Sequence, residues 1–234
     1  MHISGERGAW EGSIVTVDDI KKLRISRKIP MEVECRIPIG EFAPTPQEGE
    51  FVVFAAHFER GFALPASPFF RQMLDRLEIQ PHHLPGNAIT TIAGFVTCCE
   101  AYLSLLPSME IWAKFFTLRP HVIPDKDLPA GTKPMTQCGS AMVVPRKNSI
   151  FPRIQGLESV KRWQQSYFYV KNPEGTVDYI KLPKFVIGPP AQRTHWNYNP
   201  MDSIPEVNLV TETIRVLVDE GMTADDLLLT FLSR

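Results

Sequence analysis

The stretch from residue 85 to residue 104, PGNAITTIAGFVTCCEAYLS, decides the fold. Apolar residues recur in it every three or four positions, a spacing that lines one side of a helix. This stripe consists of Ile89, Ile92, Phe95, Val96, Cys99, Tyr102 and Leu103. A second face carries small residues, which would let another helix approach closely: Thr90, Gly94, Thr97 and Ala101. The stretch therefore predicts a central helix in the hydrophobic core.

The flanking sequence predicts further helices. Residues 67–77 open with Ser67 and Pro68, an N-cap followed by a first-turn proline, and continue with apolar residues at helical spacing. Comparable patterns predict helices over residues 16–28, 51–61, 108–116 and 157–165. Two more helices, over residues 203–220 and 223–232, should form a closing helical hairpin, because Gly221 is a typical helix end.

Short β-strands are predicted between these helices. Residues 31–49 contain prolines that prevent a regular helix, so they form an extended arm with a strand at 32–37. Residues 139–145 are the best strand of the middle region, and 167–171 with 176–182 read as a β-hairpin around an Asn-Pro-Glu-Gly turn.

The predicted fold class is α+β and helix-dominated. It has a helical N-terminal part, a small β-hairpin-containing middle and a C-terminal helical hairpin. We divide the chain into an N-terminal helix and extended arm (1–50), a helical core (51–120) and a β-containing and C-terminal helical part (121–234). We expect these parts to form one continuous module.

Composition narrows the functional classes. Apolar residues make up 44% and charged residues 22% of the chain, as in ordinary globular domains. The formal net charge of −1 creates no global field toward nucleic acid or membranes. No signal peptide or membrane-spanning run is recognisable, so we expect an intracellular protein, cytoplasmic or nuclear. Its four cysteines, Cys35, Cys98, Cys99 and Cys138, should then be reduced and buried.

No familiar catalytic or metal-binding motif is present. The sequence lacks a Gly-x-Ser-x-Gly elbow, a Gly-x-x-x-x-Gly-Lys phosphate loop and a His-Glu-x-x-His pair. The pairs His82-His83 and Cys98-Cys99 invite a zinc hypothesis, but adjacent residues on a helix point about 100° apart. Structural roles fit them better. We therefore assign no catalytic residue, metal ligand or cofactor, although a two-metal carboxylate site stays formally possible.

One segment has an unusual charge. Residues 131–171 carry seven cations and one acid, a net charge of +6, with aromatic residues among them. Cations with exposed aromatic rings suit single-stranded nucleic acid, through phosphate contacts and base stacking. The candidate binding residues are Arg146, Lys147, Arg153, Lys161, Arg162, Trp163, Tyr167, Tyr169 and Lys171. The alternative is a solvated face over core aromatics, because alternate residues of a hairpin must face inward.

Several motifs resemble a plant family, the gypsy-type transposon domain found in many copies in grass genomes, which carries a transposase label. They are His57-Phe58-Glu59-Arg60-Gly61-Phe62-Ala63-Leu64-Pro65, Ile79-Gln80-Pro81-His82-His83-Leu84, Pro85-Gly86-Asn87-Ala88-Ile89 and Cys99-Glu100-Ala101-Tyr102-Leu103, with Trp112 and Phe115-Phe116. The similarity continues through residues 167–171 to 221–227. The resemblance implies an origin in the N-terminal part of retroelement-encoded proteins, and it supplies no catalytic residues.

Our leading hypothesis is a non-enzymatic, Gag-like retroelement module that associates with itself or with nucleic acid through residues 131–171. No membrane or small-molecule partner is evident. A transposase or integrase-type, metal-dependent nuclease is one alternative, and it requires converging carboxylates. A domesticated host protein-interaction module is another, and its sign would be an apolar groove beside the long helix.

Overall fold

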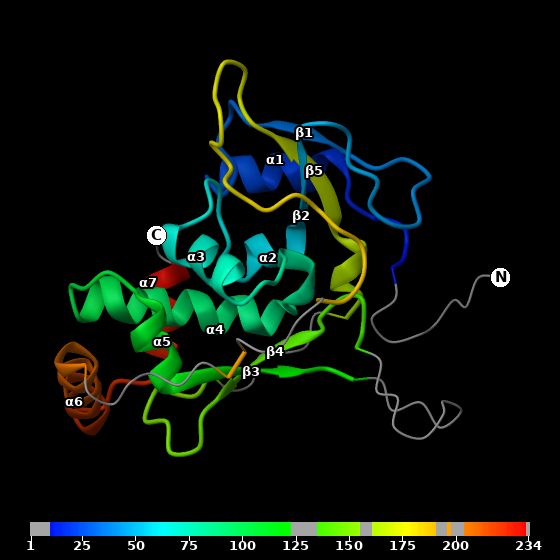
Figure 1. Ribbon diagram of the computed structural model, residues 1–234. Helices are drawn as coiled ribbons and strands as arrows, with labels where there is room; N and C mark the ends of the chain where they lie inside the picture. Colours follow the sequence, from blue (N-terminus) through cyan, green and yellow to red (C-terminus); the bar gives the residue numbers. More distant parts are fainter. Residues whose placement is uncertain (1–9, 123–134, 155–160, 191–195, 198–203, 233–234) are drawn as a thin grey trace, which may run out of the picture.

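Helix α4 (Gly86–Thr97) lies at the centre of the fold (Figure 1). The computed structural model describes residues 10–122, 135–154, 161–190, 196–197 and 204–232. The chain continues from α4 into a π-helical segment, η2 (Cys98–Tyr102), so the predicted long helix is confirmed with a change of pitch near its end. At Gly94, a Cβ atom would meet the Cδ1 of Ile154 at 2.9 Å. The close neighbour of Gly94 is therefore a loop side chain rather than another helix.

Short helices surround α4, and those near residues 16–28, 67–77 and 108–116 were predicted from the sequence. They are α1 (Val17–Ile25), α2 (Ala55–Glu59), α3 (Pro68–Arg76), the 3-10 helix η1 (Pro81–His83) and α5 (Met109–Phe115). Thr16 forms a capping box with Asp19, while Ser67 and Ser108 accept backbone hydrogen bonds at the starts of α3 and α5. These caps explain why the helix starts could be read locally.

Two small antiparallel sheets lie on opposite sides of α4 (Figure 1). The first has the order β1–β5–β2, formed by β1 (Glu34–Arg36), β5 (Tyr167–Lys171) and β2 (Glu50–Phe54). In its register, Val53 faces Phe168 and Cys35 faces Val170. The second sheet pairs β3 (Phe116–Pro120) with β4 (Ala141–Pro145). The predicted strands at 32–37, 139–145 and 167–171 are thus confirmed.

Two local predictions are wrong. Residues 51–61 are not one helix, because the apolar run up to Phe54 is strand β2 and only then does α2 begin. Short apolar runs do not distinguish a buried strand from a buried helix. Residues 176–182 do not return along β5 as a hairpin strand, since Asp178 and Lys181 adopt positive φ values of 60° and 58°. β5 pairs with β1 and β2 instead.

The helix predicted over residues 157–165 falls mainly outside the described residues. Its described end forms a single 3-10 turn, η3 (Trp163–Gln165), preceded by Arg162 in a left-handed conformation with φ 59°. This turn leads directly into β5.

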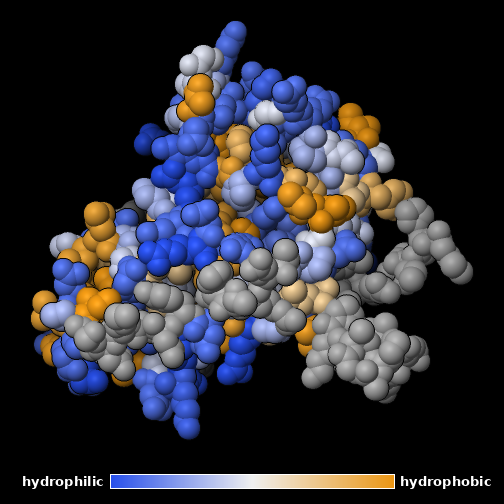
Figure 2. All heavy atoms as spheres, viewed as in Figure 1, coloured by the Kyte–Doolittle hydropathy of each residue, from blue (hydrophilic) through white to orange (hydrophobic). Residues whose placement is uncertain are grey.

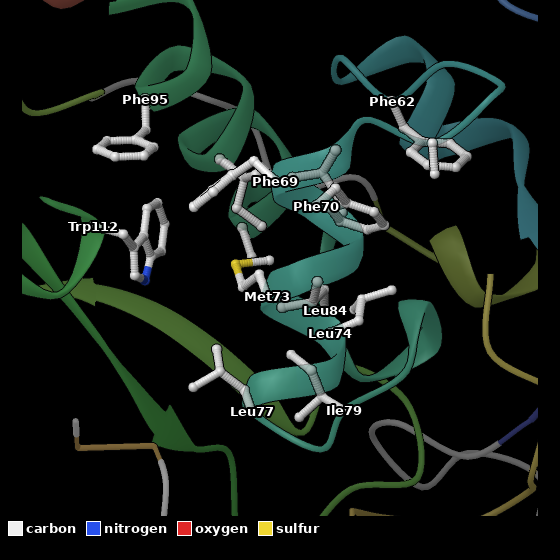
Figure 3. Packing of buried hydrophobic residues seen from close by; sticks show 14 of the residues in the cluster. Phe62, Phe69, Phe70, Met73, Leu74, Leu77, Ile79, Leu84, Phe95 and Trp112 are labelled. Atoms are coloured by element: carbon white, nitrogen blue, oxygen red, sulfur yellow. The ribbon is translucent and has the colours of Figure 1, made fainter. Parts of the chain in front are cut away.

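Aromatic and aliphatic side chains pack together in the core (Figure 3). The ring of Phe95 from α4 lies 5.1 Å from Phe69 of α3 and 5.1 Å from Trp112 of α5, measured between centroids. The same hydrophobic cluster extends from Val15 to Leu227. It contains residues from all three segments of the predicted domain division, and the division itself stays a prediction.

Two helices close the chain, α6 (Pro205–Asp219) and α7 (Ala224–Leu232). Gly221 between them has φ 104°, as a helix-ending glycine often does. α6 packs against α5, whereas α7 packs against α4. In Figure 2, apolar surface is visible at the lower left, where α6 lies, and α6 exposes Leu209 and Val216.

The α+β, helix-dominated fold class is confirmed. No described helix has the length and apolar character needed to cross a membrane.

Candidate nucleic-acid interface

A groove of about 950 Å³ opens where the first turn of α4, strand β4 and the segment before β5 meet. The side chains that give it its chemical character are Asn87, His121, Arg153, Lys161, Arg162 and Trp163. Four of them belong to the candidate residues named from the sequence. The fold therefore gathers part of the +6 segment into one concave surface.

The three groove cations are available to a ligand. The side chains of Arg153, Lys161 and Arg162 are exposed, and within the described part of the chain no hydrogen bond or ion pair holds them. No aspartate or glutamate lines the groove among the described residues. Because clefts focus the field of the charges that line them, these three cations create a local positive potential in a chain of nearly zero net charge.

The start of α4 adds a weaker positive contribution. Residues Gly86 to Ala88 line the groove, and the N-cap residue Pro85 provides no side-chain cap. The first N–H groups of a helix carry partial positive charge and favour nearby anions. The backbone dipole thus acts in the same direction as the three cations.

Trp163 is held firmly at one side of this groove. Its ring stacks on His57, with centroids 5.1 Å apart and an interplanar angle of 24°. It also meets Phe54 edge to face, again with ring centroids 5.1 Å apart. Gly139 is a neighbour of the same ring: a Cβ added there would make an ordinary van der Waals contact with Trp163 Cζ2, at 3.5 Å. The ring is only half-buried, so part of its surface lines the groove.

The ring beneath Trp163 is a neutral histidine. His57 is 2% exposed, and burial lowers its pKa to about 3, although a hydrogen bond to the Leu84 backbone opposes the shift. Among the described residues, its Nε2 has no hydrogen-bond partner. His57 therefore supports the tryptophan by packing and carries no positive charge at neutral pH.

His82 and His83 have a structural role. Their Nε2 atoms lie 3.1 and 3.0 Å from the carbonyl oxygen of Gly188, and the Gln80 N–H donates to His83 Nδ1 at 2.9 Å. Burial lowers their pKa values to about 3 and about 4. The two rings thus fix the segment around Gly188 against η1.

The cysteines do not join these histidines in a metal site. All four are free thiols, and burial raises the pKa values of Cys98, Cys99 and Cys138. Within the described ranges, no three His, Cys, Asp or Glu side chains come close enough to hold a metal ion. The nuclease alternative has no candidate ligand set in this part of the chain.

Two of the predicted stacking residues lie in the core, which corrects the sequence-based assignment. Tyr167 and Tyr169 are fully buried in β5. The Tyr167 hydroxyl donates to the Glu41 carbonyl oxygen at 2.8 Å, and the Tyr169 hydroxyl donates to the Glu41 carboxylate. Rings without exposed faces cannot stack on a base. Both faces of β5 are covered, so the alternation expected of a half-exposed hairpin is absent.

The remaining candidate cations lie outside the groove lining. Arg146 donates from Nε to the Ala113 carbonyl at 2.5 Å and from Nη1 to Asn197 Oδ1 at 3.2 Å, so it connects β4 to other segments. Lys147 is exposed on the turn that follows. Lys171 ends β5, where its register partners are Glu34 and Glu50. Lys133, another cation of the 131–171 segment, falls outside the described residues.

Two groove residues escaped the sequence analysis, namely Asn87 and His121. Neither lies in the segment with the unusual charge, and only the packing of α4 and β3 near that segment brings them into the groove. A local charge count contains no signal for such residues.

A second groove, of about 620 Å³, lies beside α4 on the side of α1. Its lining combines the charged residues Arg27, Lys28 and Glu100 with the apolar residues Phe62, Phe70, Ile89, Ile92 and Val96. An apolar groove in this place is the feature that the host-interaction alternative requires. It leaves that alternative open.

Comparison with known proteins identifies one family. Residues 52–120 match the family described as "Putative gypsy type transposon". The match runs from β2 to β3 and includes the α4 wall of the cationic groove, whereas Arg153, Lys161, Arg162 and Trp163 lie beyond it. The searches found no significant match among curated proteins or among solved structures. Residues 52–120 are thus similar to a gypsy-type transposon-related domain, and this match covers less than half of the chain.

Proposed function

We propose that this protein is a non-enzymatic retroelement module, Gag-like in its role, that binds nucleic acid through the groove at the start of α4. One observation carries the proposal. Arg153, Lys161 and Arg162 are exposed cations in this groove, and they have no partner among the described residues. No described carboxylate lines the groove. Phosphate groups would supply the missing counter-charge. The retroelement origin supports the same ligand class.

The test is a titration of labelled single-stranded RNA, single-stranded DNA and duplex DNA across a salt series, followed by fluorescence anisotropy. Three phosphate contacts on a single strand predict a slope of log K against log salt of about −2, because each contact contributes about −0.7. The double variant Lys161→Glu with Arg162→Glu should bind more weakly, and its slope should fall to about −0.7.

A matched control is available in the same segment. Lys147→Glu with Lys171→Glu changes the net charge by the same amount at two exposed lysines outside the groove lining. This control should retain nearly the full affinity. An equal loss in both double variants would assign the binding to overall charge and would refute the groove as the site.

The other hypotheses are separated by the same titration. No binding even at low salt would reject the nucleic-acid function and favour the host protein-interaction module, for which the apolar groove beside α4 is the supporting observation. Self-association is measured in parallel by sedimentation of the free protein. A metal-dependent nuclease would convert the labelled strand to products only when magnesium or manganese is added.

A further inference from the structure

We infer that Trp163 stacks on an unpaired base, so that the groove selects single-stranded nucleic acid over duplex. This inference rests on the proposed function and adds a ligand class to it. Phosphate contacts alone do not distinguish strands by their bases, because they carry no direct base information. A ring in the same groove could make that distinction.

The geometry of Trp163 suits a stacking platform. Its inner side is covered by the near-parallel ring of His57, with centroids 5.1 Å apart, and Phe54 packs against it edge to face. The exposed part of the Trp163 ring lines the groove. A platform that is already fixed loses little conformational freedom when a base stacks on it.

The charges lie where a strand would need them. Lys161 and Arg162 directly precede Trp163 in the chain, and Arg153 lines the same groove. A single strand alternates phosphates with bases that are free to unstack, so cations beside an aromatic ring match both of its chemical groups. In a duplex, neighbouring bases cover both faces of each base. Trp163 could stack on a base there only after that base had left the stack.

The experiment compares three labelled ligands on the intact protein: a single strand, the same backbone with abasic sites, and the duplex. Wild-type protein should bind the single strand more tightly than the abasic strand. Trp163→Leu should weaken binding to the single strand about tenfold, since stacking on one base carries roughly that affinity. Its binding to the abasic strand and to the duplex should be unchanged, as should the salt slope.

The abasic strand also reports whether the variant is folded. If Trp163→Leu lost its affinity for the intact and abasic strands equally, the ring would be a structural support of the groove, and the inference would be overturned. Trp163→Phe keeps an aromatic face and should restore most of the affinity for the intact strand.

The two proposals fail in different ways. Salt-dependent wild-type binding that is equal for intact and abasic strands would overturn the stacking role and leave the cationic groove standing. Absence of binding to all three ligands at low salt would remove the proposed function and the inference with it.

Discussion

His57, His82 and His83 lie in the interior with pKa values of about 3, 3 and 4, because burial disfavours the imidazolium ion. An unfolded histidine titrates near 6.5. Below that pH the unfolded chain therefore binds more protons than the folded protein does. The free energy of unfolding should be at its full value above pH 6.5 and should fall as the pH drops toward the folded-state pKa values.

The variant His57→Phe tests this at one position. It keeps a ring between Phe54 and Trp163 but removes one titrating group. Between pH 7.5 and pH 5.0, wild-type protein should lose about 2 kcal/mol more of its unfolding free energy than the variant, since 1.5 pH units lie below 6.5 and each corresponds to about 1.4 kcal/mol. Urea unfolding at the two pH values measures both losses. Equal losses would show that His57 is not protonated on unfolding.

At the scale of elements, one arginine joins β1 to β2 and to the arm between them. Arg36 donates from Nε and Nη2 to the two carboxylate oxygens of Glu50, both at 2.7 Å, and from Nη1 to Glu41 at 3.0 Å. Its guanidinium lies 3.9 Å from the ring centroid of Tyr169 on the strand between them. Hydrogen bonds from Arg36 hold the pKa of Glu50 below its usual value.

We expect Arg36→Gln to reduce the unfolding free energy by about 2 kcal/mol, because it leaves two shielded carboxylates without their cation. The side chain of Glu50 is only 8% exposed. The matched control is Arg215→Gln on α6, which breaks an exposed pair with Glu212 and should cost less than about 0.5 kcal/mol. Urea unfolding of the two variants measures both losses of free energy. If Arg36→Gln cost as little as Arg215→Gln, a structural role for Arg36 would be contradicted.

At the scale of the whole molecule, β5 connects distant parts of the chain. It lies between β1 and β2, and all its residues except Lys171 are buried. Phe168 on this strand packs on Phe58 of α2, with ring centroids 5.9 Å apart. One hydrophobic cluster extends from Val15 to Leu227. Loss of β5 should therefore weaken the N-terminal and C-terminal parts together.

Phe168→Ala should lower the unfolding free energy by about 3 to 5 kcal/mol, the usual cost of removing a fully buried aromatic ring. Circular dichroism and tryptophan fluorescence should report one coincident urea transition in wild-type protein and in the variant. The control Leu106→Ala, at a side chain that is 86% exposed, should change stability by less than about 0.5 kcal/mol. Separate transitions for the two probes would mean that the parts unfold independently.

Local patterns in the sequence determined the helices and their caps. Thr16 and Asp19, or Ser67 and Phe70, interact across three residues, and the α4 stripe repeats within one turn. Such signals need no knowledge of the rest of the chain. The charge of residues 131–171 was equally visible, because it is a property of composition. The resemblance to a retroelement family rested on sequence motifs alone, and the family match at residues 52–120 confirmed it.

Only the tertiary structure decided which of these charged and aromatic residues share a site. Strand pairing joins residues more than a hundred positions apart, such as Arg36 and Tyr169, and no local pattern specifies that partner. Because β5 became a central strand with both faces covered, Tyr167 and Tyr169 entered the core. Trp163, one turn earlier, stayed at the edge of a groove with Arg153, Lys161 and Arg162. Burial depends on what packs against a residue, and packing is a property of the folded chain.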